Sequence, residues 1–274
     1  MKKRIVLCAD DYGQAEAVSG GIVELLCSGR LSATSCMVNM PGWREQSAWL
    51  QPFKDKVDIG LHLNLTEGLP CSSAYRSYVD ERFMSLPKLL VATFSGSRKL
   101  SANVLEAEFD AQIDAFEDAM GCVPDFVDGH QHVHHLPLIR DVLASVFQKR
   151  LKRHGAYVRV AKQRINTLKA AVISLTGAGA FTEFLDLHGI QHNSSFAGIY
   201  PFGDAKKYPL YFVKFLQQSS DGGLIMCHPG LAGDDAADPL HASRVLEYQY
   251  LASDDFLADC AKMDVDITRF DLSR

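Results

Sequence analysis

The chain has 274 residues, of which 47% are hydrophobic and 22% are charged, and its formal net charge at pH 7 is -5. This composition is typical of a folded globular protein and excludes a disordered or fibrous chain. The net negative charge provides no basic surface for binding nucleic acid, and no apolar run approaches the roughly 20 residues of a membrane span. We therefore expect neither nucleic acid nor a membrane span.

The start of the chain and its cysteines bear on the cellular compartment. The basic start leads into a short apolar run, Ile5–Ala9, which ends at two aspartates too soon for the core of a secretory signal. The seven cysteines are scattered, contain no CxxC pair and are odd in number. Such cysteines are usually small buried hydrophobes, and they suit a reducing compartment. We therefore expect a cytoplasmic protein. Its oligomeric state stays open, and a homo-oligomer is compatible with the sequence.

Short apolar runs alternate with amphipathic stretches from end to end. The predicted strands are Arg4–Ala9, Ala33–Asn39, Val57–Leu65, Asp125–Gly129, Ala156–Ala161, Ser195–Ile199, Gly223–Cys227 and Val265–Phe270. The predicted helices are Gln14–Gly29, Ser101–Gly121, Leu138–Lys152, Thr167–His188, Leu210–Gln218 and His241–Lys262. The longest irregular region is Glu67–Leu100, rich in Ser, Pro and Gly, and we interpret it as a loop or lid over the site.

Alternation of strands and helices implies parallel strands joined by right-handed crossovers, with the helices outside. About seven or eight such units are what a closed (β/α) barrel requires. We expect one α/β domain over residues 1–274, folded as an irregular (β/α) barrel of about seven parallel strands. An open doubly wound sheet is the alternative. In both folds the active residues gather at the carboxyl ends of the strands.

Polar side chains occur at the carboxyl ends of five predicted strands. Asp10 and Asp11 follow the first strand, and His62 lies in the third. Arg159 lies in the fifth strand, and His228 ends the seventh. The fourth strand leads into "DGHQHVHHLP", which contains His130, His132, His134 and His135. A random surface distribution would rarely produce this recurrence, so we expect these groups to share one site.

Each of these residues also has an ordinary structural interpretation. The two aspartates could form a solvated acidic turn, His62 could be a core histidine, and Arg159 could be a structural ion-pair partner. If the histidine-rich segment is extended, its alternating positions put His130, His132 and His134 on one side. No more than two of them are expected to bind an ion, because an ion also needs water or substrate oxygens.

Considered together, the residues predict a metal site. One carboxylate and two imidazoles form a facial triad that holds a divalent ion and leaves positions open for water and substrate. Asp11 would bind the ion, while Asp10 stays free to accept a proton from a water whose pKa the ion lowers. His228 across the pocket would protonate a leaving amine, and Arg159 would pair with Asp10 and hold it in place.

Five segments of the chain, "ADDYG", "GLHLNLTEG", "DGHQHVHHLP", "YVR" and "MCHPG", occur in this order. In order and spacing they resemble the YdjC-like carbohydrate deacetylases, and the resemblance spans essentially the whole chain. That family includes chitooligosaccharide deacetylases and enzymes that deacetylate glycolipids in hopanoid synthesis. The resemblance implies a distorted (β/α) barrel related to the polysaccharide deacetylases. It also implies one divalent ion, Mg²⁺ by preference, with Zn²⁺ or Mn²⁺ as alternatives.

The resemblance implies roles for individual residues as well. The metal ligands that it implies are Asp11, His62 and His130. The catalytic residues are Asp10 as the base and His228 as the general acid. Arg159 stands where an arginine supports the base, and His132 stands beside the metal site, behind the ligands or facing the substrate. The roles of His134 and His135 are left open.

Residues and resemblance together predict a metal-dependent hydrolase that removes the acetyl group from an N-acetylated amino sugar, in an oligosaccharide or a glycoconjugate. Another metal-dependent amide or ester hydrolase on the same site is one alternative. The lack of a Gly-rich phosphate loop counts against phosphate esters. A non-catalytic carbohydrate-binding relative is the other alternative, but it predicts degraded site residues, and all matched positions are present. Neither the sugar nor the physiological metal can be read from the sequence.

Overall fold

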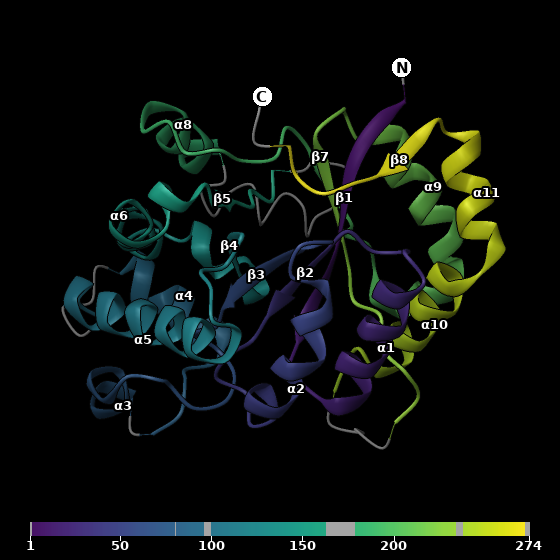
Figure 1. Ribbon diagram of the computed structural model, residues 1–274. Helices are drawn as coiled ribbons and strands as arrows, with labels where there is room; N and C mark the ends of the chain where they lie inside the picture. Colours follow the sequence, from purple (N-terminus) through teal and green to yellow (C-terminus); the bar gives the residue numbers. More distant parts are fainter. Residues whose placement is uncertain (1, 80, 96–99, 163–178, 234–237, 272–274) are drawn as a thin grey trace.

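The computed structural model describes residues 2–79, 81–95, 100–162, 179–233 and 238–271. Within these residues, a parallel sheet of eight strands forms the centre of the fold (Figure 1). The strands are β1 (Lys3–Tyr12), β2 (Ala33–Cys36), β3 (Asp58–Leu63), β4 (Phe126–Gly129), β5 (Tyr157–Val158), β6 (Phe196–Ala197), β7 (Gly223–Cys227) and β8 (Val265–Ile267). Their order is β5-β4-β3-β2-β1-β7-β6, and β8 pairs with the first half of β1.

Helices surround this sheet (Figure 1). The α-helices are α1 (Glu16–Cys27), α2 (Trp43–Leu50), α3 (Ser73–Val79), α4 (Leu86–Phe94), α5 (Ala102–Met120), α6 (Ile139–Arg150), α8 (Gly179–Leu187), α9 (Tyr208–Gln218), α10 (His241–Ala252) and α11 (Asp254–Lys262). Four short 3₁₀ helices join the described elements: η1 (Gln51–Phe53), η2 (His130–His135), η3 (Lys152–His154) and η5 (Phe202–Lys207). None of the described helices combines the length and the apolar character that a membrane span requires.

The two edges of the sheet approach each other and curl it into a barrel. Val158 of β5 forms a parallel bridge with His192, shortly before β6, and its N–H donates to the Gln191 carbonyl at 2.9 Å. Beyond this point a side chain takes the place of the backbone-to-backbone hydrogen bonds between the strands: Asn193 Oδ1 accepts from the Val160 N–H at 2.7 Å. The closure is therefore irregular and β5 is shorter than expected. The predicted irregular α/β barrel is confirmed.

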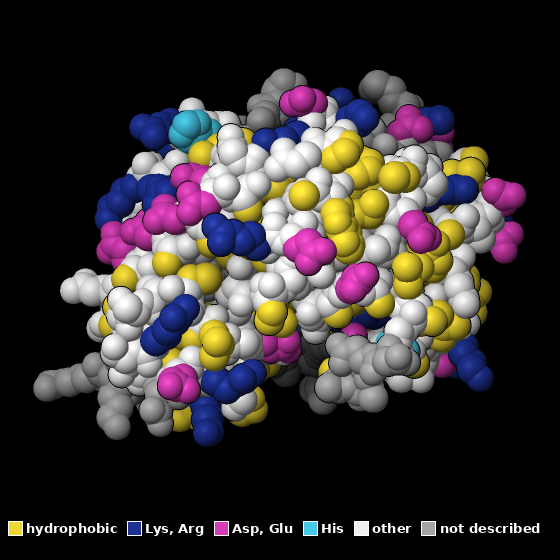
Figure 2. Space-filling view, turned by 60° about the horizontal axis from the view of Figure 1, so that its bottom comes forward, with side chains coloured by type: hydrophobic (Ala, Val, Ile, Leu, Met, Phe, Trp, Pro, Cys, Tyr) yellow, Lys and Arg dark blue, Asp and Glu magenta, His cyan; other side chains and the backbone are white. Residues whose placement is uncertain are grey.

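The central strand β1 separates two apolar layers. Val6 and Cys8 pack inside the barrel, whereas Leu7 and Ala9 pack against the outer helices. Strands that are buried on both faces read as continuous apolar runs, which is why this strand was visible in the sequence. On the face shown in Figure 2, charged side chains of both signs are interspersed with hydrophobic ones.

Three predicted elements differ in the structure. The helix predicted over His241–Lys262 is two helices, because Ser253 is extended and its side chain caps α11 by accepting from the Phe256 N–H. The segment Glu67–Leu100, predicted as a loop, contains α3 and α4. Of the helix predicted over Thr167–His188, the part before Gly179 lies outside the described residues, and the rest forms α8.

Candidate metal centre

A bulge at the end of β1 presents two adjacent carboxylates to one cavity. Cys8 packs inside the barrel and Ala9 outside, so regular alternation would point Asp10 inward and Asp11 outward. Instead Asp11 has a φ of 67°, and β1 carries one extra residue against β2 between Ala9 and Tyr12. Such bulges re-aim side chains. Both carboxylates consequently line the same cavity, 2% and 1% exposed. The two aspartates therefore lie within β1, which continues through Tyr12, and do not follow the strand as the sequence predicted.

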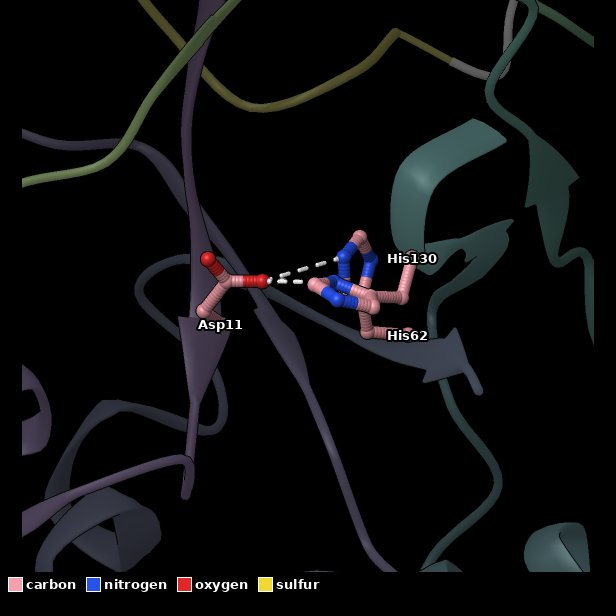
Figure 3. Close-up of side chains that lie close together, drawn as sticks. All are labelled: Asp11, His62 and His130. Carbon is pink, nitrogen blue, oxygen red and sulfur yellow. Dashed lines mark hydrogen bonds and ion pairs between the residues drawn. The ribbon is translucent and has the colours of Figure 1, made fainter. Parts of the chain in front are cut away.

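Asp11, His62 and His130 converge from three strand ends (Figure 3). Asp11 Oδ1 lies 3.4 Å from His62 Nε2 and 3.0 Å from His130 Nδ1. All three side chains are buried. Separations of this size suit neighbouring ligands of one small divalent ion, whose bonds to oxygen and nitrogen measure about 2.0–2.2 Å.

The ring of His62 is oriented from behind by Asp128. His62 Nδ1 lies 2.6 Å from Asp128 Oδ1, so an N–H at Nδ1 donates to the carboxylate and Nε2 faces Asp11. Such carboxylate–histidine pairs fix the tautomer of a metal ligand. Ser35 Oγ also donates to Asp128 at 2.6 Å, and Arg159 Nε lies 2.8 Å from it. Burial acts to raise the pKa of Asp128, but Arg159 and His62 hold it below its ordinary value.

The histidine-rich segment is a tight 3₁₀ turn and not an extended run. Gln131 and His132 have φ values of 53° and 58°, so the expectation that His130, His132 and His134 lie on one side is wrong. The left-handed pair turns the chain immediately after His130. His132 lines the cavity beside the candidate metal ligands. His134 Nε2 lies 2.9 Å from the Arg159 carbonyl, which places this ring behind the site.

The surrounding carboxylates favour positive charge at the two candidate imidazole ligands. Burial acts to lower the pKa of His62, but Asp128 and Asp10 raise it to about 10. Burial likewise opposes the charged form of His130, but Asp11 raises its pKa to about 9. A divalent cation supplies positive charge at this same point, so the electrostatics match the donor set.

Arg159 holds the other carboxylate of the bulge. Its Nη1 and Nη2 donate to the two oxygens of Asp10 at 2.5 and 2.8 Å, and the guanidinium is fully buried. Bidentate pairs of this kind fix the plane of the carboxylate as well as its position. Arg159 does not line the cavity itself, but it lies behind Asp10 and positions that side chain.

Arg244, on α10, binds the second oxygen of Asp11. Arg244 Nη2 donates to Asp11 Oδ2 at 2.8 Å and to Gln14 Oε1 at 2.6 Å, and Asp238 Oδ2 accepts from Arg244 Nε at 2.6 Å. Burial acts to raise the pKa of Asp11, but Arg244 and His130 hold it well below its ordinary value. The two oxygens of Asp11 thus have separate partners, and Oδ1 faces the histidines.

His228 lies at the end of β7 and lines the same cavity. Its peptide N–H donates to Glu247 Oε2 at 2.6 Å, and Tyr200 Oη donates to Glu247 Oε1 at 2.7 Å. The His228 Nδ1 atom is buried and has no hydrogen-bond partner among the described residues. Burial lowers the pKa of His228 to about 4. Burial also raises the pKa of Glu247 to about 7.

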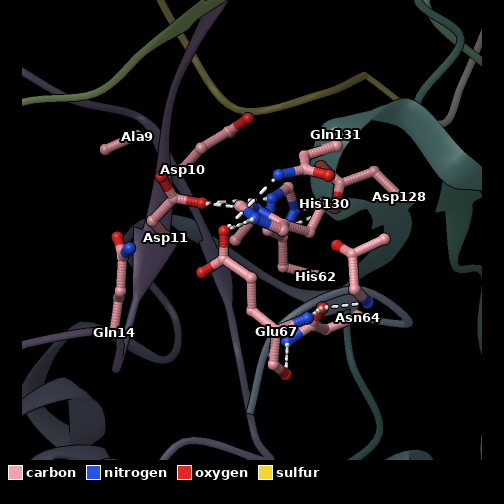
Figure 4. Close-up of polar contacts among 12 residues, drawn as sticks. Ala9, Asp10, Asp11, Gln14, His62, Asn64, Glu67, Asp128, His130 and Gln131 are labelled. Atoms are coloured by element: carbon pink, nitrogen blue, oxygen red, sulfur yellow. Dashed lines mark hydrogen bonds and ion pairs between the residues drawn. The ribbon is translucent and has the colours of Figure 1, made fainter. Parts of the chain in front are cut away.

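The cavity above these groups has a volume of about 440 Å³. Figure 4 shows Asp11, His62 and His130 pointing toward one another, with Glu67 reaching toward His130 and Asp10 next to Asp11 on the same strand. Apolar side chains from four segments of the chain also line the cavity: Leu86, Leu90, Leu136, Ile199, Phe202 and Met226. Six of the seven predicted site residues line this cavity, and Arg159 supports it from behind.

Three charged residues of the site were not predicted: Glu67, Arg244 and Glu247. Asp128 was expected at the end of the fourth strand, and Glu67 lies inside a quoted motif, but neither had an assigned role. Arg244 and Glu247 lie three positions apart on the buried face of α10, which also carries Tyr250 and Leu251. Two charges within an apolar stripe are unusual, because buried charges need partners. This pattern is the sequence signal from which Arg244 and Glu247 could have been predicted as site residues.

Fold and site together define an α/β-barrel protein with an Asp–His–His candidate metal site at the carboxyl ends of its strands. The chain belongs to the YdjC-like protein family, whose sequence model matches residues 4–262.

Several curated relatives carry the name carbohydrate deacetylase. The one from Clostridium beijerinckii is 29% identical over 231 residues, which cover 83% of this chain and 81% of the relative. The one from Danio rerio is 35% identical over 149 residues, which cover 53% of this chain and 46% of the relative. The chain therefore spans about half the length of that vertebrate relative.

Two crystal structures share the fold. One is an Enterococcus faecalis V583 protein provisionally described as a cellobiose-phosphate cleavage protein, with a TM-score of 0.77, 19% identity and 98% coverage of both chains. The other is a family 4 carbohydrate esterase from Streptomyces lividans in complex with acetate. Its TM-score is 0.51 at 9% identity, covering 99% of this chain and 94% of the esterase. The predicted polysaccharide-deacetylase-like fold is thereby confirmed.

Proposed function

We propose that this protein is a metal-dependent hydrolase that removes the acetyl group from an N-acetylated amino sugar. One observation carries the proposal. Three ligand-type atoms of Asp11, His62 and His130 converge on one point, while Asp10, bound by no candidate ligand, is held beside them by Arg159. The names of the curated relatives support the carbohydrate substrate.

The residues present fit one divalent ion. They offer one carboxylate oxygen and two imidazole nitrogens, with the ring of His62 oriented by Asp128. When bound, such an ion polarises an acyl oxygen and makes water a stronger acid. Imidazole ligands favour Zn²⁺, carboxylate and water ligands suit Mn²⁺ and Mg²⁺, and the family resemblance implies Mg²⁺. Adding each ion to metal-free protein decides between them.

Asp10 acts as the base in this proposal. It lies next to the candidate ligand Asp11 in the chain and lines the same cavity, so it can reach a water at the reacting carbon. Arg159 takes up both of its oxygens from behind and fixes the carboxylate plane. A base must be within hydrogen-bond reach of the proton that it removes, and this adjacency provides it.

His228 supplies the proton to the departing amine. Because burial lowers its pKa to about 4, its ring is neutral at neutral pH before the reaction begins. Negative charge that develops beside an imidazole raises its proton affinity, so His228 gains a proton as the tetrahedral transition state forms. His228 takes this proton from solvent and gives it to the departing amine, while Asp10 takes one proton from the water and releases it to solvent at the end of the cycle, so the protons balance.

We also propose that residues 1–274 form one domain. Within it, the segment 67–100 contributes Glu67, Leu86 and Leu90 to the cavity wall. We place the protein in the cytoplasm, where its free cysteines stay reduced.

Acetate release from N-acetylglucosamine oligosaccharides tests the function, measured with Mg²⁺, Zn²⁺, Mn²⁺ or EDTA. We expect release that EDTA abolishes and one of the ions restores. Aryl acetates run in parallel distinguish a general esterase. If neither substrate class is hydrolysed with any ion, the protein is not a deacetylase and the non-catalytic alternative holds.

A further inference from the structure

The two oxygens of Asp11 face different partners. Oδ1 lies 3.0 Å from His130 Nδ1 and 3.4 Å from His62 Nε2, on the side of the candidate metal centre. Oδ2 accepts from Arg244 Nη2 at 2.8 Å, on the side of α10. The carboxylate therefore presents one oxygen to the two imidazoles, while a guanidinium cation occupies the other.

The guanidinium of Arg244 is fixed by two further contacts. Asp238 Oδ2 accepts from its Nε at 2.6 Å, and Gln14 Oε1 accepts from its Nη2 at 2.6 Å. The residue is only 2% exposed. Burial acts to lower the pKa of Arg244, but Asp11 and Asp238 raise it above its ordinary value, so the side chain stays charged. Arg244 cannot leave Oδ2 without giving up these contacts and leaving buried carboxylates without a cation.

The stem of Arg244 passes over a glycine on its way to Asp11. Gly230, the last residue of "MCHPG", has no side chain, and a Cβ there would lie 3.2 Å from Arg244 Cβ and 3.3 Å from Arg244 Cδ. The Gly230 N–H also donates to the Arg244 carbonyl at 3.1 Å. The loop after β7 thus holds both the backbone and the stem of Arg244, and the position of the guanidinium is built into the fold.

The number of free oxygens on Asp11 affects which ion the centre can hold. Ca²⁺ gathers about six to eight oxygen ligands and often takes both oxygens of a carboxylate. Zn²⁺, Mn²⁺ and Mg²⁺ are smaller, gather fewer ligands and are served by one carboxylate oxygen. An ion that approached Oδ2 would meet the positive charge of Arg244, which lies 2.8 Å from that oxygen. Arg244 therefore opposes the coordination that Ca²⁺ uses and leaves that of the smaller ions intact.

We propose that Arg244 is a determinant of metal selectivity: by occupying Asp11 Oδ2 it limits this ligand to one oxygen and discriminates against Ca²⁺. The effect adds to that of the two imidazoles, which also disfavour Ca²⁺. The inference rests on the metal centre of the proposed function and deepens it, because it assigns the choice of ion to a residue that is not a ligand.

Competition between Mn²⁺ and Ca²⁺ for metal-free protein tests the inference. Electron paramagnetic resonance measures free Mn²⁺ as Ca²⁺ is added, which yields the ratio of the two dissociation constants. Both ions are divalent, so the loss of a positive charge from the protein affects them alike and cancels in the ratio. The main variant is Arg244→Gln, whose amide nitrogen replaces Nε beside Asp238 but is too short to reach Asp11. We expect its preference for Mn²⁺ over Ca²⁺ to fall about tenfold or more.

Three further variants separate this effect from a general loosening of the site. Arg244→Met combined with Asp238→Asn removes the guanidinium without leaving Asp238 as an unpaired buried charge, and it should lower the preference as Arg244→Gln does. Asp238→Asn alone keeps the contact between Arg244 and Asp11 and should leave the preference unchanged. Arg244→Lys keeps a cation that can reach Oδ2 and should retain most of the preference.

The outcomes distinguish this inference from the proposed function. An unchanged preference in Arg244→Gln or in the double variant overturns the role of Arg244, even if wild-type protein releases acetate. An equal fall in Asp238→Asn overturns it as well. A fall confined to the variants that free Oδ2 supports it, even if no acetate is released. Wild-type protein that binds neither ion would overturn the metal centre itself, and the inference with it.

Discussion

Arg159 and Asp10 form a fully buried bidentate ion pair, with Nη1–Oδ1 and Nη2–Oδ2 distances of 2.5 and 2.8 Å. The third nitrogen of the same guanidinium, Nε, lies 2.8 Å from Asp128, the carboxylate behind His62. One cation therefore positions both the proposed base and the orientation of a proposed metal ligand.

Replacing this guanidinium tests that double role. The Arg159→Lys variant keeps the positive charge, but the lysine ammonium group cannot contact two carboxylates at once as the forked guanidinium does. We expect acetate release to fall about 100-fold or more, and the free energy of unfolding in urea to fall by about 3 kcal/mol, because a buried carboxylate loses its partner. Arg150→Lys is the matched control, since Arg150 contacts three carboxylates at the surface. Its cost should stay below about 1 kcal/mol. Equal costs for both variants would contradict the role of Arg159.

The two aspartates of the bulge should respond differently to the same change. Asp10→Asn removes a base and should lower the rate of acetate release about 10²–10⁴-fold while leaving the affinity for the ion intact. Asp11→Asn removes a proposed ligand and should lower the affinity for the ion. Calorimetric titration with Zn²⁺ or Mn²⁺ measures the second quantity. If Asp10→Asn loses the ion and Asp11→Asn keeps it, the two roles are reversed.

The carboxylate behind His62 should tune metal affinity without touching the ion. Asp128→Asn leaves an oxygen for His62 Nδ1 but removes the charge, so we expect metal affinity to fall about 10–100-fold. The matched control is Ser35→Ala, which removes the hydroxyl that donates to Asp128 and leaves the contact with His62. It should change metal affinity much less. A thermal melt of each variant checks that the loss does not come from unfolding.

The free energy of unfolding should depend on pH through the buried side chain of Glu247. Its pKa is raised by burial from 4.5 to about 7, so the folded state favours the protonated carboxyl. Its contribution to stability is complete below about pH 4.5 and is lost as the pH rises to about 7. Glu247→Gln cannot titrate and should remove this loss, which amounts to at most about 3 kcal/mol at about 1.4 kcal/mol per pKa unit.

Urea unfolding of wild-type protein and Glu247→Gln at pH 5 and pH 8 measures the effect. The quantity of interest is how much the difference between the two proteins changes with pH, since a constant offset from the new amide cancels. Other groups that titrate in both proteins, such as Asp125 with a pKa of about 6, cancel as well. The exposed ion-pair partner Glu106, changed to Gln, is the control. A difference that does not vary with pH would mean that Glu247 is ionised at low cost.

The sequence allowed the fold and the polar strand ends to be predicted because both depend on local patterns. Runs such as Ile5–Ala9 are continuous and apolar, and parallel strands place their carboxyl ends at one edge. The break at Ser253 has a local signal too, a serine followed by two aspartates at the start of a helix, but the continuous apolar stripe outweighed it.

Other features could not be predicted, since they depend on distant contacts. Arg244 reaches Asp11 from a helix 233 residues further along the chain, and no local pattern specifies that contact. The turn at Gln131 and His132 uses left-handed backbone at two residues that are not glycine, which composition does not indicate. The turn is followed by a second distant contact, between His134 and the Arg159 carbonyl, which lies 25 residues further along the chain.

The left-handed residue at Asp11 makes the site depend on the number of residues in β1 as well as on their identity. The only residues between Ala9 and Tyr12 are Asp10 and Asp11, so removing the extra residue of the bulge also removes one carboxylate. Regular pairing with β2 would then leave a single aspartate, pointing into the barrel, in place of a separate candidate ligand and base. A relative with a deletion of one residue here would lose this division of roles while it kept every motif downstream.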